Sequence, residues 1–516
     1  MKKMLLIATI GLLSLSASTH AADISACKAG GINLDGFSYY STDRVFYDLA
    51  KIAANWVIPG ENTPVKVDND GYPLAVDSGS KPAQTMITYD NWNSDPQKED
   101  KYVILYDGEG QLLTGLPADK VLQDTPGRIV FKPNMGNLFL NLIKTNPDNH
   151  LRNIRLIPLD MEKSYVEHPF RPRYINTWSM FPVWRFMDLM ATNNSLVTSW
   201  QTRKLQTAYG AEGGVPIEEI INLANQAQVA PWLNIPHLAT DDYIVNLANY
   251  VKEHLDPKLK VYIEYSNEAW NSGFKQHGFM EVEGKKHGMD ANQFYADRAL
   301  SIFKVWEQVF GGTDKIVRVV GTQASVPWVS ERILSWKDLA KHTDALAVGN
   351  YFGYEYGSDL VEKTLTMTVD QLMEDIKVTG LAKQKQFLMA QKAIADKYKI
   401  SLVAYEAGQH LVGAGFNQNL GFLPDNVKLS DLFVAANRHP KMKEIYKQHY
   451  QNWIEVGGSM IGWFSSTFVY GKWGSWGLLE NGGQKIETAP KFMAVKDIQT
   501  QLDKKSIDAC KYVLTP

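Results

Sequence analysis

Short apolar segments alternate with longer segments of helical spacing over most of this chain. The apolar segments are rich in Val, Ile, Trp and Tyr, which is typical of strands, and helical segments separate most of them. Eight such strands are expected near residues 32, 183, 232, 261, 316, 346, 402 and 461. Strands that alternate with helices form parallel sheets. Eight units of this size predict an α/β fold, a closed (β/α)₈ or TIM barrel.

The segment from about residue 57 to residue 157 has a different pattern. Short β-rich runs alternate with turn sequences such as 68–71 (DNDG) and 107–110 (DGEG), and no long helical period occurs. Closely spaced short strands predict an antiparallel, sandwich-like domain. The segment follows a predicted first helix, Arg44–Trp56, and precedes the second barrel strand. We therefore predict a β-rich domain inserted into the barrel.

The N-terminus has the three parts of an export signal. Two lysines precede the apolar run Met4–Leu15, and small and polar residues follow as far as Ala22. The run is too short to span a bilayer comfortably, so an uncleaved anchor is the weaker alternative. We predict a signal peptide, residues 1–21, cleaved after Ala21 or Ala22. The mature protein is then exported, to the periplasm or the medium.

The two cysteines lie near the ends of the predicted mature chain, at Cys27 and Cys510. Exported proteins form disulfides, and the termini of a domain are often close in space. A Cys27–Cys510 disulfide is therefore expected. Two free thiols, or lipidation of Cys27 after the lipobox-like residues 24–26, are the alternatives. The predicted parts are the signal peptide, the start of the barrel, the β-rich insert, the rest of the barrel and a C-terminal tail, with bounds 1–21, 22–56, 57–157, 158–502 and 503–516.

Charge and composition exclude two classes of protein. The chain has 53 basic and 56 acidic residues, a net charge of −3, so it lacks the basic excess typical of nucleic-acid-binding proteins. Only the N-terminus carries a long apolar run, which excludes a protein that spans the membrane several times. We predict no nucleic-acid partner and no membrane span in the mature chain. The oligomeric state cannot be deduced from these features.

Two glutamates follow predicted strands at the same end of the barrel. Glu268 comes after the fourth strand, in 264–271 (EYSNEAWN), and Glu406 after the seventh, in 404–410 (AYEAGQH). Functional side chains of such barrels lie at the C-terminal ends of the strands. A lone glutamate is usually a surface or ion-pair residue, which is our interpretation of Glu264. Two carboxylates across one cleft are the machinery of glycoside hydrolysis.

The pair Asn267-Glu268 after the fourth strand, with Glu406 after the seventh, resembles clan A of the glycoside hydrolases, the retaining (β/α)₈ group. The resemblance covers about 30–56 and 180–502. It implies that Glu268 is the acid/base, that Glu406 is the nucleophile, and that Asn267 donates to the sugar 2-hydroxyl. It also implies a β-linked poly- or oligosaccharide substrate, no cofactor, and carboxyl groups roughly 5 to 5.5 Å apart.

Other residues at strand ends are candidates for binding the substrate. Arg185 and Tyr351 occupy places where this clan has an Arg and a Tyr beside the nucleophile. A Trp at the end of the eighth strand resembles the sugar-stacking Trp of the clan, and two more lie in the Gly-rich loop that follows. The candidates are Arg185, His237, Tyr351, Trp463, Trp473 and Trp476.

Each candidate also has a structural alternative. Arg185 and Asp188 are close enough in sequence to form a salt bridge, His237 suits a hydrogen-bonded core residue, and any single Trp suits core packing. The chain lacks a zinc-protease motif, a serine nucleophile elbow, a P-loop and a dinucleotide fingerprint, which agrees with a reaction that needs no cofactor. A non-catalytic carbohydrate-binding or scaffold protein and a transglycosylase are the alternative functions.

Overall fold

The computed structural model describes residues 24–61, 63–76, 81–89, 99–114, 119–134 and 137–513. The predicted signal peptide, residues 1–21 with cleavage after Ala21 or Ala22, lies outside the described residues. Within those ranges, no helix is both long enough and apolar enough to cross a bilayer.

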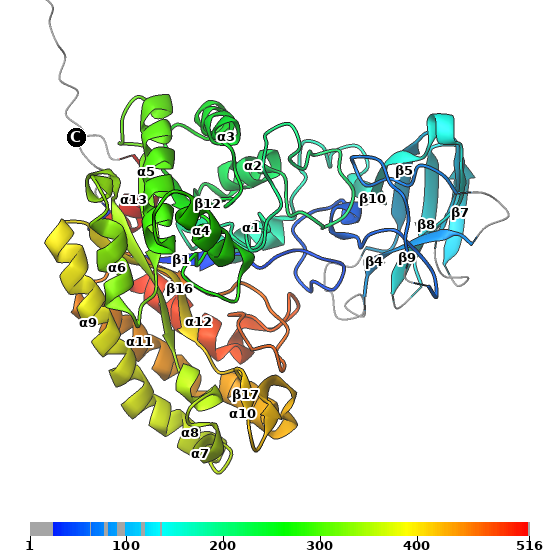
Figure 1. Cartoon of the computed structure of the whole chain (residues 1–516). Coiled ribbons are helices and arrows are strands. Elements are labelled where there is room, and N and C mark those ends of the chain that lie inside the picture. Colours follow the sequence, from blue (N-terminus) through cyan, green and yellow to red (C-terminus); the bar gives the residue numbers. More distant parts are fainter. Residues whose placement is uncertain are drawn as a thin grey trace, which may run out of the picture.

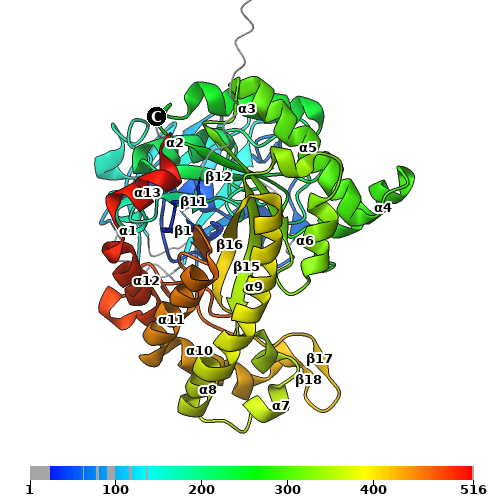
Figure 2. The same ribbon diagram turned by 90° about the vertical axis from the view of Figure 1, so that its left-hand side faces the viewer.

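Eight parallel strands close into a barrel, as the alternation predicts. Figure 2 shows these strands at the centre of a ring of helices. Every barrel strand lies at an expected position, so the predicted α/β fold is confirmed. In order around the barrel, the strands are β1 (Gly30–Asn33), β11 (Val183–Arg185), β12 (Ala230–Ile235), β13 (Val261–Tyr265), β14 (Ile316–Thr322), β15 (Ala345–Phe352), β16 (Ser401–Gln409) and β19 (Ile461–Trp463).

The barrel interior changes from apolar to polar along the strands. Side chains alternate between the two faces of a strand, so residues two apart share a face. On β12, Ala230 and Trp232 belong to a buried apolar cluster, and Asn234 follows them on the same face. On β13, Tyr262 belongs to that cluster and Glu264 follows it. Polar side chains therefore occupy the C-terminal end of the interior, where functional residues are expected.

Helices cover the outside of the barrel. Their starts carry caps of the usual kind: the Thr240 hydroxyl accepts from the backbone N–H of Tyr243, and Asp290 forms a capping box with Gln293. The helices are α1 (Pro172–Trp178), α2 (Ile217–Ala227), α3 (Asp241–His254), α4 (Lys275–Lys286), α5 (Ala291–Phe310), α6 (Pro327–Leu334), α7 (Val361–Thr364), α8 (Val369–Asp375), α9 (Leu381–Tyr398), α10 (Val427–Arg438), α11 (Lys441–Val456), α12 (Pro490–Gln501) and α13 (Lys504–Lys511).

The predicted helix Arg44–Trp56 is wrong. Only one short 3₁₀ turn, Leu49–Ile52, forms there. The neighbouring backbone pairs with other parts of the chain, since the N–H of Ala54 donates to the carbonyl of Met86 and the Asp48 carboxylate accepts from the N–H of Leu156. The helical spacing of the apolar residues is real, but contacts with the β-rich segment replace the helix.

The β-rich segment forms two antiparallel sheets outside the barrel, visible at the right of Figure 1. Residues of both sheets, such as Ile104 and Leu140, belong to the large core that also includes barrel residues. One sheet has the order β10 (Arg152–Pro158), β5 (Tyr102–Asp107), β8 (Arg128–Lys132) and β7 (Lys120–Thr125). The other has the order β3 (Thr63–Pro64), β2 (Val57–Ile58), β4 (Ala83–Thr88), β9 (Leu138–Thr145) and β6 (Gly110–Thr114).

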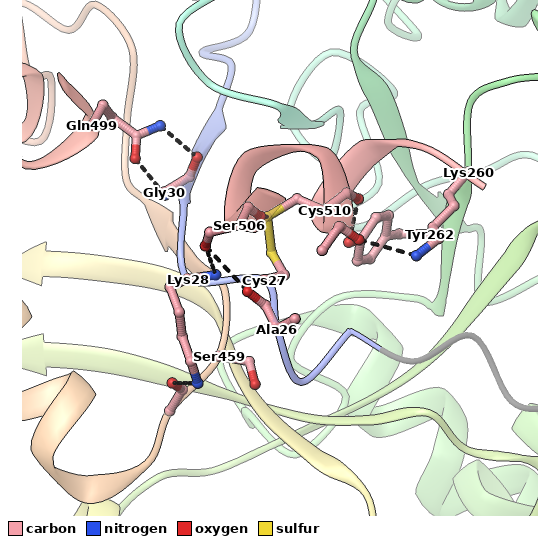
Figure 3. Close-up of a disulfide and its surroundings, with 12 residues drawn as sticks. Ala26, Cys27, Lys28, Gly30, Lys260, Tyr262, Ser459, Gln499, Ser506 and Cys510 are labelled. Carbon is pink, nitrogen blue, oxygen red and sulfur yellow. Dashed lines mark hydrogen bonds between the residues drawn. A yellow bond between two sulfur atoms is a disulfide. The ribbon is translucent and has the colours of Figure 1, made fainter. Parts of the chain in front are cut away.

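Cys27 and Cys510 form the predicted disulfide, with Cα atoms 4.8 Å apart (Figure 3). Cys27 precedes β1, so the bridge lies at the N-terminal end of the strands. The predicted tail is partly helical, because α13 carries Cys510. Ser506 of that helix also joins the two ends: its hydroxyl accepts from the N–H of Lys28 at 2.9 Å and donates to the carbonyl of Ala26 at 3.1 Å.

Candidate functional site

Glu268 stands just beyond the C-terminal end of β13. Two residues in this turn have left-handed backbone conformations, Ser266 with φ 61° and Glu268 with φ 40°. Non-glycine residues in this region are uncommon and occur often at functional sites. The turn brings Glu268 next to Tyr405 of β16, whose hydroxyl donates to Oε1 of Glu268 at 2.9 Å.

A β-bulge in β16 positions the second glutamate. Val348 of β15 lies opposite Ala404, but the next residue, Gly349, lies opposite Glu406, so Tyr405 is the extra residue. Because of the bulge, consecutive residues on one strand both reach the site, whereas regular alternation would turn them to opposite faces. Gly349 makes room for this, because a Cβ atom there would lie 3.1 Å from the Tyr405 hydroxyl.

Glu406 is 5% exposed and receives two strong hydrogen bonds. Arg185 Nη1 donates to Oε1 at 2.8 Å, and the Tyr351 hydroxyl donates to Oε2 at 2.7 Å. Both donors compensate the negative charge of the carboxylate. Arg185 and Tyr351 thus lie beside Glu406, where the resemblance places them.

Arg185 is the centre of a buried polar network. Besides Glu406, its guanidinium donates to Glu264 Oε2 at 2.9 and 3.1 Å, to Asn267 Oδ1 at 2.8 Å and to Asn33 Oδ1 at 3.0 Å. Burial alone would lower the pKa of Arg185, but the charges of Glu264 and Glu406 raise it above its usual value. The ion pairs of Arg185 join it to these two glutamates. The alternative partner, Asp188, forms no ion pair with it in the described ranges.

Glu264 has the structural role that we expect for it. Besides Arg185, the indole N–H of Trp232 and the amide of Asn234 each donate to its Oε2 at 2.9 Å. Glu264 is 1% exposed and therefore has no access to a ligand. It holds the guanidinium of Arg185 in place beside Glu406.

The environment of Glu268 favours the protonated form. Burial, together with the nearby charge of Glu406, raises the pKa of Glu268 to about 7, although hydrogen bonds from Asn271 and Tyr405 act in the opposite direction. Near neutral pH, Glu268 therefore exists in both protonation states. The two carboxyl groups differ in their partners: Glu406 has an arginine, and Glu268 has only neutral donors.

A pocket of about 540 Å³ opens beside Glu268. Its lining includes Tyr351, near the end of β15, and residues just beyond β13, β14 and β16, such as Trp270, Gln323 and His410. The indole N–H of Trp270 and Nδ1 of His410 are buried and have no hydrogen-bond partner in the part of the chain that the structure describes. Burial lowers the pKa of His410 to about 4, so its ring is neutral.

Trp463 is not part of the site, which corrects the sequence-based expectation. Its side chain is 0% exposed, stacks on Tyr446 and packs so close to Gly30 that a Cβ atom there would lie 2.6 Å from the indole nitrogen. The next residue, Phe464, instead faces Tyr351 and Trp476, with ring centroids 6.3 and 5.8 Å away. Strand alternation directs one aromatic residue into the core and its neighbour toward the site.

The other predicted aromatic residues divide into two groups. Trp476 lies beside the site, 5.9 Å from Tyr351 and 5.0 Å from His410 between ring centroids. Trp473, on the same loop as Trp476, is 59% exposed and contacts Phe422. His237 is buried against Phe279 and does not line the pocket, and its Nδ1 has no hydrogen-bond partner among the described residues.

Sequence reasoning missed several residues of the site. Tyr405 directly precedes Glu406 on one strand, so regular alternation predicts that the two side chains face opposite ways. Nothing in the sequence signals the bulge that brings both of them to the site. Asn271 lies only three residues after Glu268, so its position in the sequence is a signal for it. Its amide donates to Oε2 of Glu268 at 2.8 Å. Phe464 was hidden by the more conspicuous Trp463. The residues that the structure describes contain no cluster of three or more His, Cys, Asp or Glu suited to a metal ion.

No protein-family model matches the chain, and no curated protein does either. Among solved structures it is similar to a Bacteroidetes-affiliated GH5 cellulase linked with a polysaccharide utilization locus, at 10% identity and a TM-score of 0.40 over 65% of this chain and 85% of the other. A broad-specificity GH5-4 endoglucanase from Clostridium longisporum gives 12% identity and a TM-score of 0.39 over 67% and 90%. XEG5B, a GH5 xyloglucan-specific β-1,4-glucanase from a ruminal metagenomic library, gives 13% and 0.39 over 69% and 91%. Similarity this low does not assign the chain to a family.

Proposed function

We propose that this protein is an exported, retaining glycoside hydrolase that acts on β-linked poly- or oligosaccharides. The observation that carries the proposal is the contrast between two glutamates at one end of the barrel. Glu406 is paired with Arg185, whereas burial and the charge of Glu406 raise the pKa of Glu268 to about 7. Two carboxyl groups in such different environments are the basis of acid and nucleophile roles in glycosidases.

In the proposed reaction, protonated Glu268 gives its proton to the glycosidic oxygen as the bond to the anomeric carbon breaks. The Glu406 carboxylate attacks that carbon and forms a covalent glycosyl-enzyme, and the aglycone leaves as an alcohol. Glu268, now a carboxylate, takes a proton from water, and the hydroxide oxygen displaces Glu406. A pKa near 7 suits a residue that acts as acid in one step and as base in the next.

The neighbouring residues have supporting roles in this proposal. Tyr351 and Arg185 orient Glu406 through its two oxygens. One amide hydrogen of Asn267 is used by Asn193, at 3.0 Å, and the second has no partner among the described residues, so it can donate to the sugar 2-hydroxyl. Trp476, beside Tyr351, offers an aromatic face to a sugar ring. The predicted signal peptide and the disulfide support export.

The first test is the release of reducing ends from a panel of plant, algal and bacterial β-glycans. The wild type is compared with Glu406→Gln and with Glu487→Gln, an exposed glutamate outside the pocket, as the matched control. We expect Glu406→Gln to lose at least about a thousandfold in rate, since the nucleophile is absent, and Glu487→Gln to match the wild type. Equal rates for all three proteins would contradict the proposed site.

The stereochemistry of the product tests the retaining mechanism. Proton NMR during hydrolysis should show that the first product has the anomeric configuration of the substrate. Inversion of the anomeric configuration would show that Glu406 is not a nucleophile. Binding of glycans without hydrolysis, unchanged in Glu406→Gln, would instead favour the carbohydrate-binding protein. Products longer than the substrate at high acceptor concentration would identify a transglycosylase.

A further inference from the structure

A second pocket, of about 580 Å³, lies between the barrel and the β-rich segment. One wall is the loop after β11, residues 191–197. The other lining residues are Asn55 and Trp56, residues within 64–71 of the β-rich segment, and residues within 202–213. The pocket therefore exists only because the two parts of the molecule meet there.

This pocket is connected to the candidate catalytic residues by one side chain. Asn193 lines it, and Oδ1 of Asn193 accepts from the amide of Asn267 at 3.0 Å. Asn267 is followed directly by Glu268, which lines the pocket beside β13. The hydrogen-bonded pair Asn193 and Asn267 therefore links the wall of the second pocket to the turn that carries Glu268.

The lining of the second pocket combines apolar and polar side chains, and its charges balance. It carries two acidic side chains, Asp70 and Glu212, and two basic ones, Arg203 and Lys204. Burial lowers the pKa of Lys204 to about 8, and its ammonium donates to the backbone carbonyl of Gly210 at 2.6 Å. No excess charge remains to select an anion or a cation. Neutral amide and hydroxyl groups complete the lining: Asn55, Asn69, Asn193, Asn194, Ser195 and Thr202.

Trp56 adds a buried donor to this lining. It is 2% exposed and packs against Tyr209, with ring centroids 5.4 Å apart. Its indole N–H is buried and has no hydrogen-bond partner within the described ranges.

We propose that the second pocket binds a neutral β-glycan, as the continuation of the chain whose bond lies between Glu268 and Glu406. Many hydroxyl groups without net charge suit a charge-balanced wall that carries several amide and hydroxyl groups. The inference rests on the proposed function and deepens it: the β-rich segment lengthens the substrate site, and the enzyme acts better on polymers than on short oligosaccharides.

The test measures binding separately from cleavage. In the inactive Glu406→Gln background, affinity electrophoresis is run in gels that contain hydroxyethylcellulose, barley mixed-linkage β-glucan or konjac glucomannan. We add the double change Asn55→Ala and Asn69→Ala, two exposed residues of the pocket wall. The matched control is Asn249→Ala, an exposed asparagine on the outer helix α3.

We expect the double variant to bind the retarding polymer about tenfold more weakly, because two polar contacts are lost, and the control to bind unchanged. Unchanged binding by the double variant, with an unchanged melting temperature, would overturn the proposal. A failure of the wild type to cleave any glycan would refute the proposed function alone, because the loss of binding in the double variant would still locate a glycan site in this pocket.

A length series on the wild type needs no variant. The value of kcat/KM should continue to rise with the number of sugar units beyond the shortest oligosaccharide that is cleaved, because longer chains reach the second pocket. A plateau at that shortest length would overturn the proposal even if the double variant failed to fold.

Discussion

The barrel and the β-rich segment bury their strands in different ways. Every residue of β12, β13 and β14 is buried, whereas burial alternates along β9 and every residue of β7 is exposed. A polar residue in a sheet with one wet face simply faces water. In a strand that is buried on both faces it needs a partner, so polar residues such as Glu264 indicate a built network.

The largest effect that follows from this contrast is on stability. Glu264→Leu leaves the buried guanidinium of Arg185 without one of its two carboxylates. We expect a loss of about 3–5 kcal/mol in the free energy of unfolding, measured with urea. The matched change in the β-rich segment is Gln84→Leu, on β4, which removes a half-exposed hydrogen bond to Asn141 and should cost about 1 kcal/mol or less. Equal losses in the free energy of unfolding for the two variants would contradict the expected difference between the barrel and the β-rich segment.

The second largest effect on stability is expected at the disulfide, which joins the two ends of the barrel and does not involve the β-rich segment. Replacing Cys27 and Cys510 together by Ala should lower the free energy of unfolding by about 2–5 kcal/mol. The bridge lies at the N-terminal end of the strands, away from Glu268 and Glu406, so kcat at 25 °C should stay unchanged. A lower kcat with an unchanged melting temperature would contradict this separation of stability from the site.

A smaller effect concerns pH. The Tyr405 hydroxyl donates to Glu268 and so favours its charged form. Tyr405→Phe removes this donor, raises the pKa of Glu268 further and keeps the acid protonated at higher pH. We expect the alkaline limb of kcat against pH to move upward by about 0.5–1 unit. Tyr102→Phe, on β5, is the control and should leave the profile in place; a downward shift in Tyr405→Phe would reverse our interpretation.

The smallest effect is expected on β7. Val121 is 48% exposed on a strand with no buried residue. Val121→Thr keeps the branched shape and should change the free energy of unfolding by less than about 0.5 kcal/mol. A larger loss in the free energy of unfolding would mean that Val121 is buried by a contact in solution. The difference in burial between β7 and the barrel strands would then be smaller than the structure indicates.

The sequence predicts the barrel well because its signals are local. Apolar runs and helical spacing are enough to find every barrel strand, and the polar residues that end those runs include Arg185, Tyr351 and both glutamates. The helix predicted for Arg44–Trp56 does not form because this segment bonds to distant parts of the chain instead. The N–H of Ala54 donates to the carbonyl of Met86, and the N–H of Leu156 donates to the carboxylate of Asp48. Local spacing contains no information about such partners.

The errors at the site have a similar origin. Whether Trp463 or Phe464 faces the pocket depends on the register of a three-residue strand, which sequence patterns do not fix. The role of Tyr405 depends on a bulge, and the second pocket depends on how the β-rich segment meets the loop after β11. Both features arise from contacts between distant segments.

The bulge in β16 also governs how this site tolerates insertions and deletions. Because one extra residue lies opposite Val348 and Gly349, Tyr405 reaches Glu268 and the next residue, Glu406, reaches Arg185. Deletion of a single residue between Ser401 and Ala404 would slide the strand by one register position and direct one of these side chains outward, while every residue of the candidate site remained in the sequence. A change of length in β16 is therefore expected to disturb the site even when no residue of the site is replaced.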